Sequence, residues 1–581
     1  MSFNAAGVDE YLFTIGILVA FVGTVVSAAF GRRQIRAALK GSGIRWMHVL
    51  AAAAIVALFL GAELAIVKPT QLLFFDDVIY QAGAVSLLHS GQAWMCNYGT
   101  PTTCLMGQIF HEPIGTSFLL AISFGLFGVQ LAVAYHTLLA VTAVAVFMAF
   151  LVGAVLLKDP IAGLFSELIL GLTPVVLVWA MPTTSDMPML AFGLISIFFM
   201  LVFLRKKSLW TFAALLLSAA LVSYMKVDAL LYLPVLLVMF LILDTGNLRK
   251  DIKILKRNLL EPLFLVVILL FAVSILPEAV YTYAQLTTGN YGVGTSSYLS
   301  YSCVLTGPAI VTNQTLGLKS IEANFCPNVL FWTNAYYKSN YVMQPLIYTL
   351  FAVLGGIAMA FRKKREVIAV VVWFGAFFMM YLSFYAGSVL YGVDWRFMLE
   401  MAAPVSILGG YFASLSFTKG IKVRRKSVLS VFRSRAARAI AYAVVLAAIF
   451  YPLYAMAPLL GVKPANVLQA PDARFYEGFV YNSISAVPSS CLIFSYDPTL
   501  MIINGKTSAQ IGYLNAQSYG TYKSEYSCLV VDWGYWCYTP NNYCTTINQT
   551  FTLKSIVNST FTEENKTYGF DYVTGLKNGS S

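Results

Sequence analysis

Two adjacent aspartates, Asp76 and Asp77, follow an apolar segment that is long enough to span a membrane. Charge at a membrane boundary is costly to place, so it usually serves a function. A carboxylate there can accept the proton of a hydroxyl group that attacks a partly lipidic substrate. Asp is also favoured at helix N-caps, and Asp77 is well placed to cap a helix that starts at Val78. A cap needs only one aspartate, so we expect Asp76 or Asp77 to act as a general base, with Asp76 preferred because Asp77 is the better placed cap.

Three further charged residues stand between apolar segments. Asp186 suits either a helix cap or the role of a second catalytic acid. Lys226 needs an anion, which Asp228 or a substrate phosphate could supply. Arg396 could pair with Glu400 one helical turn away, or it could present its guanidinium fork to a phosphate. Together they predict acids that take up a proton and cations that bind the phosphate of a lipid-linked donor.

The tripeptide His111-Glu112-Pro113 precedes another apolar segment. Pro suits the first position of a helix and Glu suits the first turn, and the sequence alone favours this structural interpretation. The alternative is that His111 and Glu112 bind substrate.

Membrane-spanning helices must position these residues. The chain has 581 residues, of which 59% are hydrophobic and 11% charged, whereas soluble proteins are about a quarter charged. Its mean hydropathy is +0.74. We expect an all-α polytopic membrane protein with about 12 transmembrane helices, because apolar runs of roughly 17–25 residues recur. The expected spans are 11–30, 47–67, 130–156, 161–180, 187–204, 209–225, 229–243, 258–280, 342–361, 367–387, 397–417 and 438–458.

Basic residues fall on every second connection between these spans. Six such connections hold 26 of the 38 Lys and Arg residues, which identifies the cytoplasmic face by the positive-inside rule. Both termini and the acidic candidates then lie on the non-cytoplasmic side, in the cell membrane if the source is archaeal. This topology accounts for the net charge of +12, so we expect no nucleic-acid partner.

All eight cysteines fall in the expected exterior segments, in even numbers per segment, which indicates disulfides in an oxidising space. A metal site is the alternative, but no His accompanies them at ligand spacing. We expect Cys96–Cys104 and Cys303–Cys326 pairs, because each loop holds only those two. The other four allow three pairings and are Cys491, Cys528, Cys537 and Cys544. Five candidate N-glycosylation sequons also lie outside, at Asn313, Asn548, Asn558, Asn565 and Asn578.

Two loops and a tail form most of the exterior part. Within the first loop, 68–129, helical spacing of apolar residues predicts interfacial helices at Val78–His89 and Ile114–Phe127. The second loop covers 281–341. The transmembrane domain is expected at 1–458, and 459–581 should form a small α+β or β-rich exterior domain stapled by disulfides. Its short runs, such as 491–496 and 527–533, are typical of strands.

The order of these motifs resembles the C-type glycosyltransferase superfamily, closest to the protein O-mannosyltransferase and lipid A aminoarabinose transferase branch. The resemblance covers about 70–415. It is carried by Asp76-Asp77, His111 to Gly115, Leu126-Phe127-Gly128, Thr183 to Leu190, Lys226 before Pro234, and Asp394 to Phe397 before Pro404. Glu112 replaces the first Pro of the family's His-Pro-Pro element, and the span 11–30 is additional. The resemblance implies a polyprenyl-phosphate sugar donor, a catalytic aspartate in the first exterior loop and inversion at the anomeric carbon.

The leading functional hypothesis is therefore transfer of a sugar from a polyprenyl (dolichyl-type) phosphate to an exterior protein, lipid or glycan. An oligosaccharyltransferase is an alternative, although Asp532-Trp533-Gly534-Tyr535-Trp536 has the residue types of that signature in the wrong order. A transporter is another alternative, suggested by Glu63 and Glu167 within the expected spans, but no repeat is visible. A structural or adhesive surface protein would explain the tail and not the loop acids. No cofactor is certain, since Lys226 and Arg396 could neutralise the phosphate, or the acids could hold one divalent cation.

Overall fold

The computed structural model describes most of the chain. Its longer described stretches are residues 10–67, 74–100, 113–244, 262–288, 343–383, 392–417, 435–460, 471–538 and 543–577. Shorter ones are 103–105, 108–109, 298–301, 308–311, 321, 324–325, 328–329, 331–332, 422–423 and 426–427. The chain divides into two compact units. The first comprises Met1–Lys68, Leu138–Ala180 and Ser185–Pro464, and the second comprises Pro69–Thr137, Met181–Thr184 and Ala465–Ser581.

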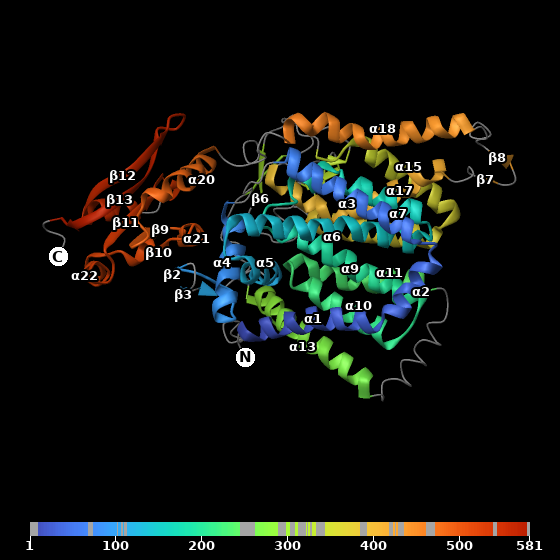
Figure 1. Ribbon diagram of the computed structural model, residues 1–581, viewed down its shortest axis with the longest axis horizontal. Helices are drawn as coiled ribbons and strands as arrows, with labels where there is room; N and C mark the ends of the chain where they lie inside the picture. Colours follow the sequence, from blue (N-terminus) through green and yellow to red (C-terminus); the bar gives the residue numbers. More distant parts are fainter. Residues whose placement is uncertain are drawn as a thin grey trace. The chain divides into compact units, whose positions relative to one another are not determined.

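The first unit is a bundle of apolar helices (Figure 1). Within the described residues of the chain, seven helices are long and apolar enough to span a membrane, and six shorter apolar helices accompany them. These findings confirm a polytopic helical membrane protein, while the number of 12 spans stays a prediction. The main helices are α1 (Glu10–Phe30), α2 (Arg32–Gly41), α3 (Trp46–Ile66), α6 (Leu131–Leu157), α7 (Pro160–Gly171), α8 (Pro174–Val178), α9 (Asp186–Arg205), α10 (Leu209–Ser223), α11 (Tyr232–Leu243), α13 (Pro262–Thr288), α15 (Leu346–Arg362), α16 (Lys364–Ser383), α17 (Leu399–Phe417) and α18 (Arg435–Leu460).

The span expected at 161–180 is not one helix. Asp159 caps α7 by accepting hydrogen bonds from the backbone N–H groups of Ile161 and Ala162. The helix ends at Gly171, and α8 begins at Pro174 after Thr173 adopts an extended backbone. Proline disfavours a helical conformation in the residue before it, and this accounts for the break. Two other spans begin with 3₁₀ turns, η2 (Val227–Leu231) before α11 and η3 (Gly392–Met398) before α17.

Small residues allow close packing in this unit. A Cβ atom on Gly355 of α15 would collide with the backbone of Leu408 on α17, and one on Gly410 would collide with Ser166 and Ala162 of α7. Helix pairs in membranes rely on such close approach, because burial of apolar surface between them gains little over contact with lipid. The packing of α7, α15 and α17 thus depends on glycine at these positions.

The second unit contains a seven-stranded sheet in the order β12-β13-β11-β9-β10-β2-β3. The strands are β2 (Tyr98–Thr100), β3 (Thr103–Leu105), β9 (Cys491–Ser495), β10 (Thr507–Gln510), β11 (Cys528–Trp533), β12 (Phe551–Phe561) and β13 (Lys566–Leu576). Strand β9 is parallel to both β10 and β11. The predicted strands at 491–496 and 527–533 are thereby confirmed as β9 and β11.

Helices complete the second unit. They are α4 (Phe74–Ser90), α5 (Gly115–Phe127), α20 (Pro471–Ser483), α21 (Pro498–Ile503), α22 (Ala516–Glu525) and α23 (Tyr543–Thr550). Alternate residues of β9 and β11 point to opposite faces, as the period of two in a strand requires. Ile493 and Val530 join one apolar cluster together with α20, while Leu492 and Leu529 join another. Both expected helices of the first loop are present.

The chain also contains minor elements. Further 3₁₀ turns are η5 (Ile484–Ala486), η6 (Ile511–Tyr513) and η7 (Tyr535–Tyr538). Short strand pairs are β1 (Trp94–Met95) with β4 (Gln108–Ile109), β5 (Tyr298–Tyr301) with β6 (Pro308–Val311), and β7 (Lys422–Val423) with β8 (Lys426–Ser427).

The sheet also contains chain from the first loop. Residues Tyr98 and Gly99 of β2 pair with Ala509 and Ser508 of β10 in antiparallel register. No local pattern in the first loop predicted that β2 and β3 extend the C-terminal sheet. The first loop and the C-terminal region therefore form one folded unit.

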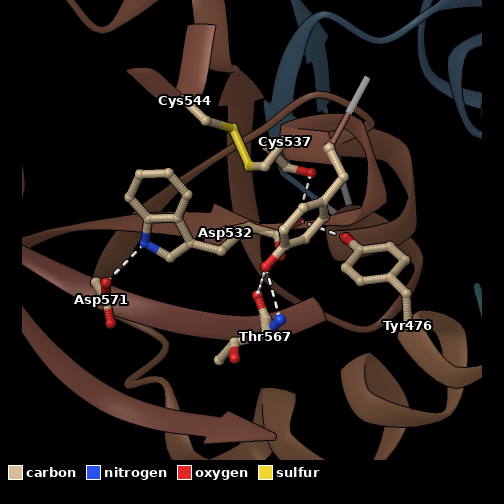
Figure 2. Close-up of a disulfide and its surroundings, with 9 residues drawn as sticks. Tyr476, Asp532, Cys537, Cys544, Thr567 and Asp571 are labelled. Atoms are coloured by element: carbon tan, nitrogen blue, oxygen red, sulfur yellow. Dashed lines mark hydrogen bonds between the residues drawn. A yellow bond between two sulfur atoms is a disulfide. The ribbon is translucent and has the colours of Figure 1, made fainter. Parts of the chain in front are cut away.

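Two disulfides bridge the tail cysteines. Cys491 and Cys528 are register partners on the parallel strands β9 and β11, with a Cα–Cα distance of 4.5 Å. Cys537 pairs with Cys544 (Figure 2). This is one of the three pairings that the sequence allowed. Cys96 is disulfide-bonded, but the side chain of Cys104 and both residues of the Cys303–Cys326 pair lie outside the described residues, so these two pairings stay predictions.

Candidate active site

The first candidate group surrounds Asp77 at the start of α4. The helix begins at Phe74, so Asp76 and Asp77 lie in its first turn and Asp77 does not cap a helix starting at Val78. The capping interpretation is therefore wrong, because the helix extends four residues further than the apolar spacing suggested. Asp77 is fully buried. The side chain of Asp76 lies outside the described part of the structure.

Hydrogen bonds from Gln81 to Thr183 and from Thr183 to Asp77 orient the Asp77 carboxylate. The Oγ1 atom of Thr183 lies 3.0 Å from Oδ1 of Asp77 and donates to it, and it lies equally close to the backbone carbonyl of Asp77. Thr183 in turn accepts a hydrogen bond from Nε2 of Gln81, at 2.9 Å. Gln81 follows Asp77 by one helical turn, so both side chains lie on the same face of α4. The orientation of the carboxylate is thus fixed by a residue 106 positions away.

The second candidate group is an ion cluster in the first unit. Nζ of Lys226 lies 2.9 Å from Oδ1 of Asp186 and 3.1 Å from Oδ2 of Asp228. Arg396 places Nη1 3.9 Å from the other carboxylate oxygen of Asp186. Burial lowers the pKa of Lys226, but the charges of Asp186 and Asp228 outweigh this and raise it above its ordinary value. The two carboxylates therefore favour the charged form of Lys226.

Three helix junctions bring this cluster together. Asp186 is the first residue of α9, where an acidic side chain suits the helix dipole. Lys226 immediately precedes η2, and Arg396 lies within η3. The ammonium group of Lys226 also lies 5.0 Å from the ring centre of Phe397, a distance suited to cation–π attraction. The sequence alternative of a Lys226–Asp228 pair is present, and Asp186 is an additional partner.

Buried tyrosines hold the remaining acids of this cluster. Tyr232 donates a hydrogen bond of 2.5 Å to Oε2 of Glu400. Tyr381 donates to Oδ2 of Asp228. The structure thus places Glu400 against Tyr232 and Arg396 near Asp186. Neither tyrosine was among the predicted site residues, because the contacts join positions 168 and 153 residues apart.

Charge balance distinguishes the two cations. Lys226 has two carboxylates within ion-pair distance, so a phosphate would have to compete with both of them. Arg396 carries several N–H donors on a planar fork, and its Nη1 atom lies farther from Asp186 than Nζ of Lys226 does. The geometry therefore favours Arg396 over Lys226 as a direct phosphate contact.

Other predicted residues are only partly described. His111 and Glu112 lie outside the described residues. Asn548, Asn558 and Asn565 have exposed side chains, which glycosylation requires, whereas Asn313 and Asn578 lie outside the described residues. Within the part of the chain that the structure describes, no group of three or more His, Cys, Asp or Glu side chains could hold a metal ion.

A third polar group occupies the C-terminal sheet. Asp532 is fully buried, and its Oδ2 atom accepts hydrogen bonds from Tyr476 at 2.6 Å and from Ser495 at 2.7 Å. Figure 2 shows the Tyr476 hydroxyl directed at Asp532 beside the Cys537–Cys544 disulfide. Burial raises the pKa of Asp532 to about 7, although both hydroxyl donors oppose the shift. Burial likewise raises the pKa of Asp497 to about 7.

Comparison with known proteins supports the expected superfamily. Residues 111–276 match the family model described as dolichyl-phosphate-mannose-protein mannosyltransferase. The chain also resembles the crystal structure of ArnT from Cupriavidus metallidurans bound to undecaprenyl phosphate. That match has a TM-score of 0.52 and 14% sequence identity, and covers 91% of this chain and 98% of ArnT. The apo state of the same protein gives a TM-score of 0.53 at 13% identity, covering 90% and 97% of the two chains.

No curated protein has a significant sequence match to this chain. At 14% identity, the likeness to ArnT concerns the fold. It extends over nearly the whole chain. The family-model match adds sequence evidence for 111–276, a region that includes Asp186, Lys226 and Asp228.

Proposed function

We propose that this protein is an integral membrane glycosyltransferase that moves a sugar from a polyprenyl-phosphate donor to a hydroxyl group on an exterior acceptor. The observation that carries the proposal is the match of 111–276 to the mannosyltransferase family model, which includes three members of the ion cluster. Two findings support it further. The fold resembles that of a protein whose crystal structure contains undecaprenyl phosphate, and the distribution of basic residues favours an exterior position for the acids.

Asp77 is the general base in this proposal. The acceptor hydroxyl gives its proton to Asp77 while its oxygen forms a bond to the anomeric carbon of the sugar. The bond between that carbon and the phosphate oxygen breaks at the same time, and the polyprenyl phosphate leaves with the electron pair. Thr183 and Gln81 keep the Asp77 carboxylate in one orientation, which is the requirement for efficient proton transfer.

Arg396 binds the phosphate, and Asp186 and Lys226 position it. The leaving phosphate gains negative charge in the transition state, so a fixed cation stabilises it more than the bound donor. Asp186 lies between Lys226 and Arg396 and thereby sets the orientation of both. In this proposal the transferred sugar is a hexose or a pentose, and the acceptor is a protein, a lipid or a glycan. Both termini lie on the non-cytoplasmic side in this proposal.

Transfer by the purified protein tests the function directly. The full chain is reconstituted into liposomes with radiolabelled polyprenyl-phosphate mannose, glucose or aminoarabinose, and release of polyprenyl phosphate is measured together with labelled acceptor. The Asp77→Asn variant should lose about 10²- to 10⁴-fold in turnover, since it removes a positioned base. Asp159→Asn is the matched control, because Asn caps helices as well as Asp, and Asp159 caps α7 and accepts a hydrogen bond from Ser414 without belonging to either candidate group. Equal turnover in wild type and Asp77→Asn would refute the assignment of the base.

A further inference from the structure

The C-terminal domain contacts the first turn of α4, next to Asp77. Val78 belongs to a buried apolar cluster that contains Tyr476, Phe479 and Val480 of α20, and Tyr481 packs against the same cluster. Helix α21 also packs on α4. All of these residues, together with Thr183, belong to the second compact unit. The helix that carries the proposed base is therefore held by the C-terminal domain itself.

Polar side chains of α20 accompany this contact. Glu477 and Tyr481 are four residues apart, so they share one face of α20. Glu477 is 9% exposed. The charges of Glu477 and Asp77 both act on the Tyr481 hydroxyl, and the charge of Asp497 does so more weakly. Tyr135 of α6 also experiences the charges of Asp77 and Glu477. Two carboxylates and two phenolic hydroxyls thus gather around the start of α4.

Such a cluster has a clear chemical use beside a general base. Thr183 holds one oxygen of Asp77, and a proton acceptor needs its remaining oxygen directed at the substrate. A phenolic hydroxyl can donate to a carboxylate, and a neighbouring negative charge increases the affinity of that carboxylate for a proton. Tyr481 packs against the cluster that contains Val78, the residue next to Asp77, and Glu477 shares its face of α20.

We propose that Glu477 and Tyr481 of the C-terminal domain are positioning residues for Asp77, so that this domain completes the active site of the first loop. The inference rests on the proposed function, and it adds two residues from outside the region that the family model matches. Glu477 contributes through its charge and Tyr481 through its hydroxyl. The domain therefore takes part in the reaction and does not serve as a passive attachment.

Conservative variants of the full-length protein separate this role from packing. Tyr481→Phe keeps the ring and removes only the hydroxyl, and Glu477→Gln keeps the shape and removes the charge. Each should lower kcat by about 10- to 100-fold, because misplacement of a catalytic group has effects of that size. The KM for the lipid donor and the thermal unfolding temperature should stay at wild-type values. The Glu477→Asp variant should have a higher kcat than Glu477→Gln, since aspartate keeps the negative charge.

Tyr476→Phe provides the matched control. It makes the same chemical change on the same helix, but the Tyr476 hydroxyl donates to Asp532 within the domain. This variant should lower the unfolding temperature and leave kcat unchanged at a temperature where it is folded. Wild-type kcat in both Tyr481→Phe and Glu477→Gln, with Asp77→Asn inactive, would overturn this inference and leave the proposed function intact. A kcat loss that follows the unfolding temperature would also overturn it. Absence of transfer by the wild-type protein would refute the proposed function, and with it any catalytic contribution of α20.

Discussion

The C-terminal domain should become less stable as the pH rises from about 4 to 8. Asp532 is completely buried, and its Oδ1 atom has no hydrogen-bond partner within the described structure. An unpaired buried oxygen disfavours the charged form, and burial accordingly raises the pKa of Asp532 from 3.8 to about 7. When the folded state has the higher pKa, it binds the proton more tightly than the unfolded state. The stabilisation is then fully present below pH 3.8 and is lost as the pH rises through about 7.

The size of the effect follows from the shift. A difference of about three pKa units corresponds to roughly 4 kcal/mol, at about 1.4 kcal/mol per unit. Asp497 shifts in the same direction to about 7, and the pKa of Asp571 is also raised by burial, so neither opposes the effect. A loss of several kcal/mol is large compared with the total stability of a small domain, which is about 5–15 kcal/mol.

Hydrogen exchange measures this loss in the intact protein. Mass spectrometry of peptides from β9 and β11 gives the free energy of opening for the sheet, after correction for the pH dependence of intrinsic exchange. Asp532→Asn cannot ionise, so it should reduce the slope of stability against pH, whereas Asp159→Asn in the first unit should leave it unchanged. Constant or increasing protection of β9 and β11 from pH 4 to pH 8 would refute the reasoning.

Three further predictions concern the two candidate groups and a disulfide. Thr183→Val should lower kcat about tenfold, because it removes the hydroxyl that orients Asp77, while Thr183→Ser should retain activity. Equal kcat in both variants would contradict a role of the Thr183 hydroxyl in orienting Asp77. Arg396→Lys should lower turnover by about 10²- to 10³-fold, since lysine cannot reproduce the guanidinium fork. Wild-type turnover in this variant would make the ion pair of Arg396 with Asp186 structural. Reduction of the Cys491–Cys528 disulfide should destabilise the sheet by about 2–5 kcal/mol, as measured by hydrogen exchange of β9. Unchanged exchange of β9 after reduction would count against a structural role for this disulfide.

Hydropathy was sufficient to predict a polytopic helical membrane protein, because apolar length determines membrane crossing. It could not predict the interruption after Gly171, since the apolar pattern continues through Pro174. The positions of Asp186, Lys226 and Arg396 at helix junctions were also readable from the sequence. Their mutual contacts were not, because ion pairs between separate helices depend on how the bundle packs.

The acid pair Asp76-Asp77 was identified from charge at the end of an apolar segment, yet the residue that orients Asp77 was not. Thr183 has no local feature that distinguishes it from other threonines between spans. The same limit applies to Glu477 and Tyr481, whose importance depends on the docking of α20 against Val78. Local patterns predict elements and their ends, whereas partners more than 100 residues away require the fold.

The pairing of β2 with β10 also affects how the protein is made. Gly99 and Ser508 are register partners separated by about 400 residues of chain. Synthesis at roughly 5–20 residues per second leaves this partner missing for about 20–80 s after the first loop emerges. During that time the edge of β2 is unpaired and Val78 lacks its apolar neighbours on α20. Asp77 therefore acquires its final surroundings only near the end of translation, and a chain that stalls earlier lacks the contact of α20 with Val78.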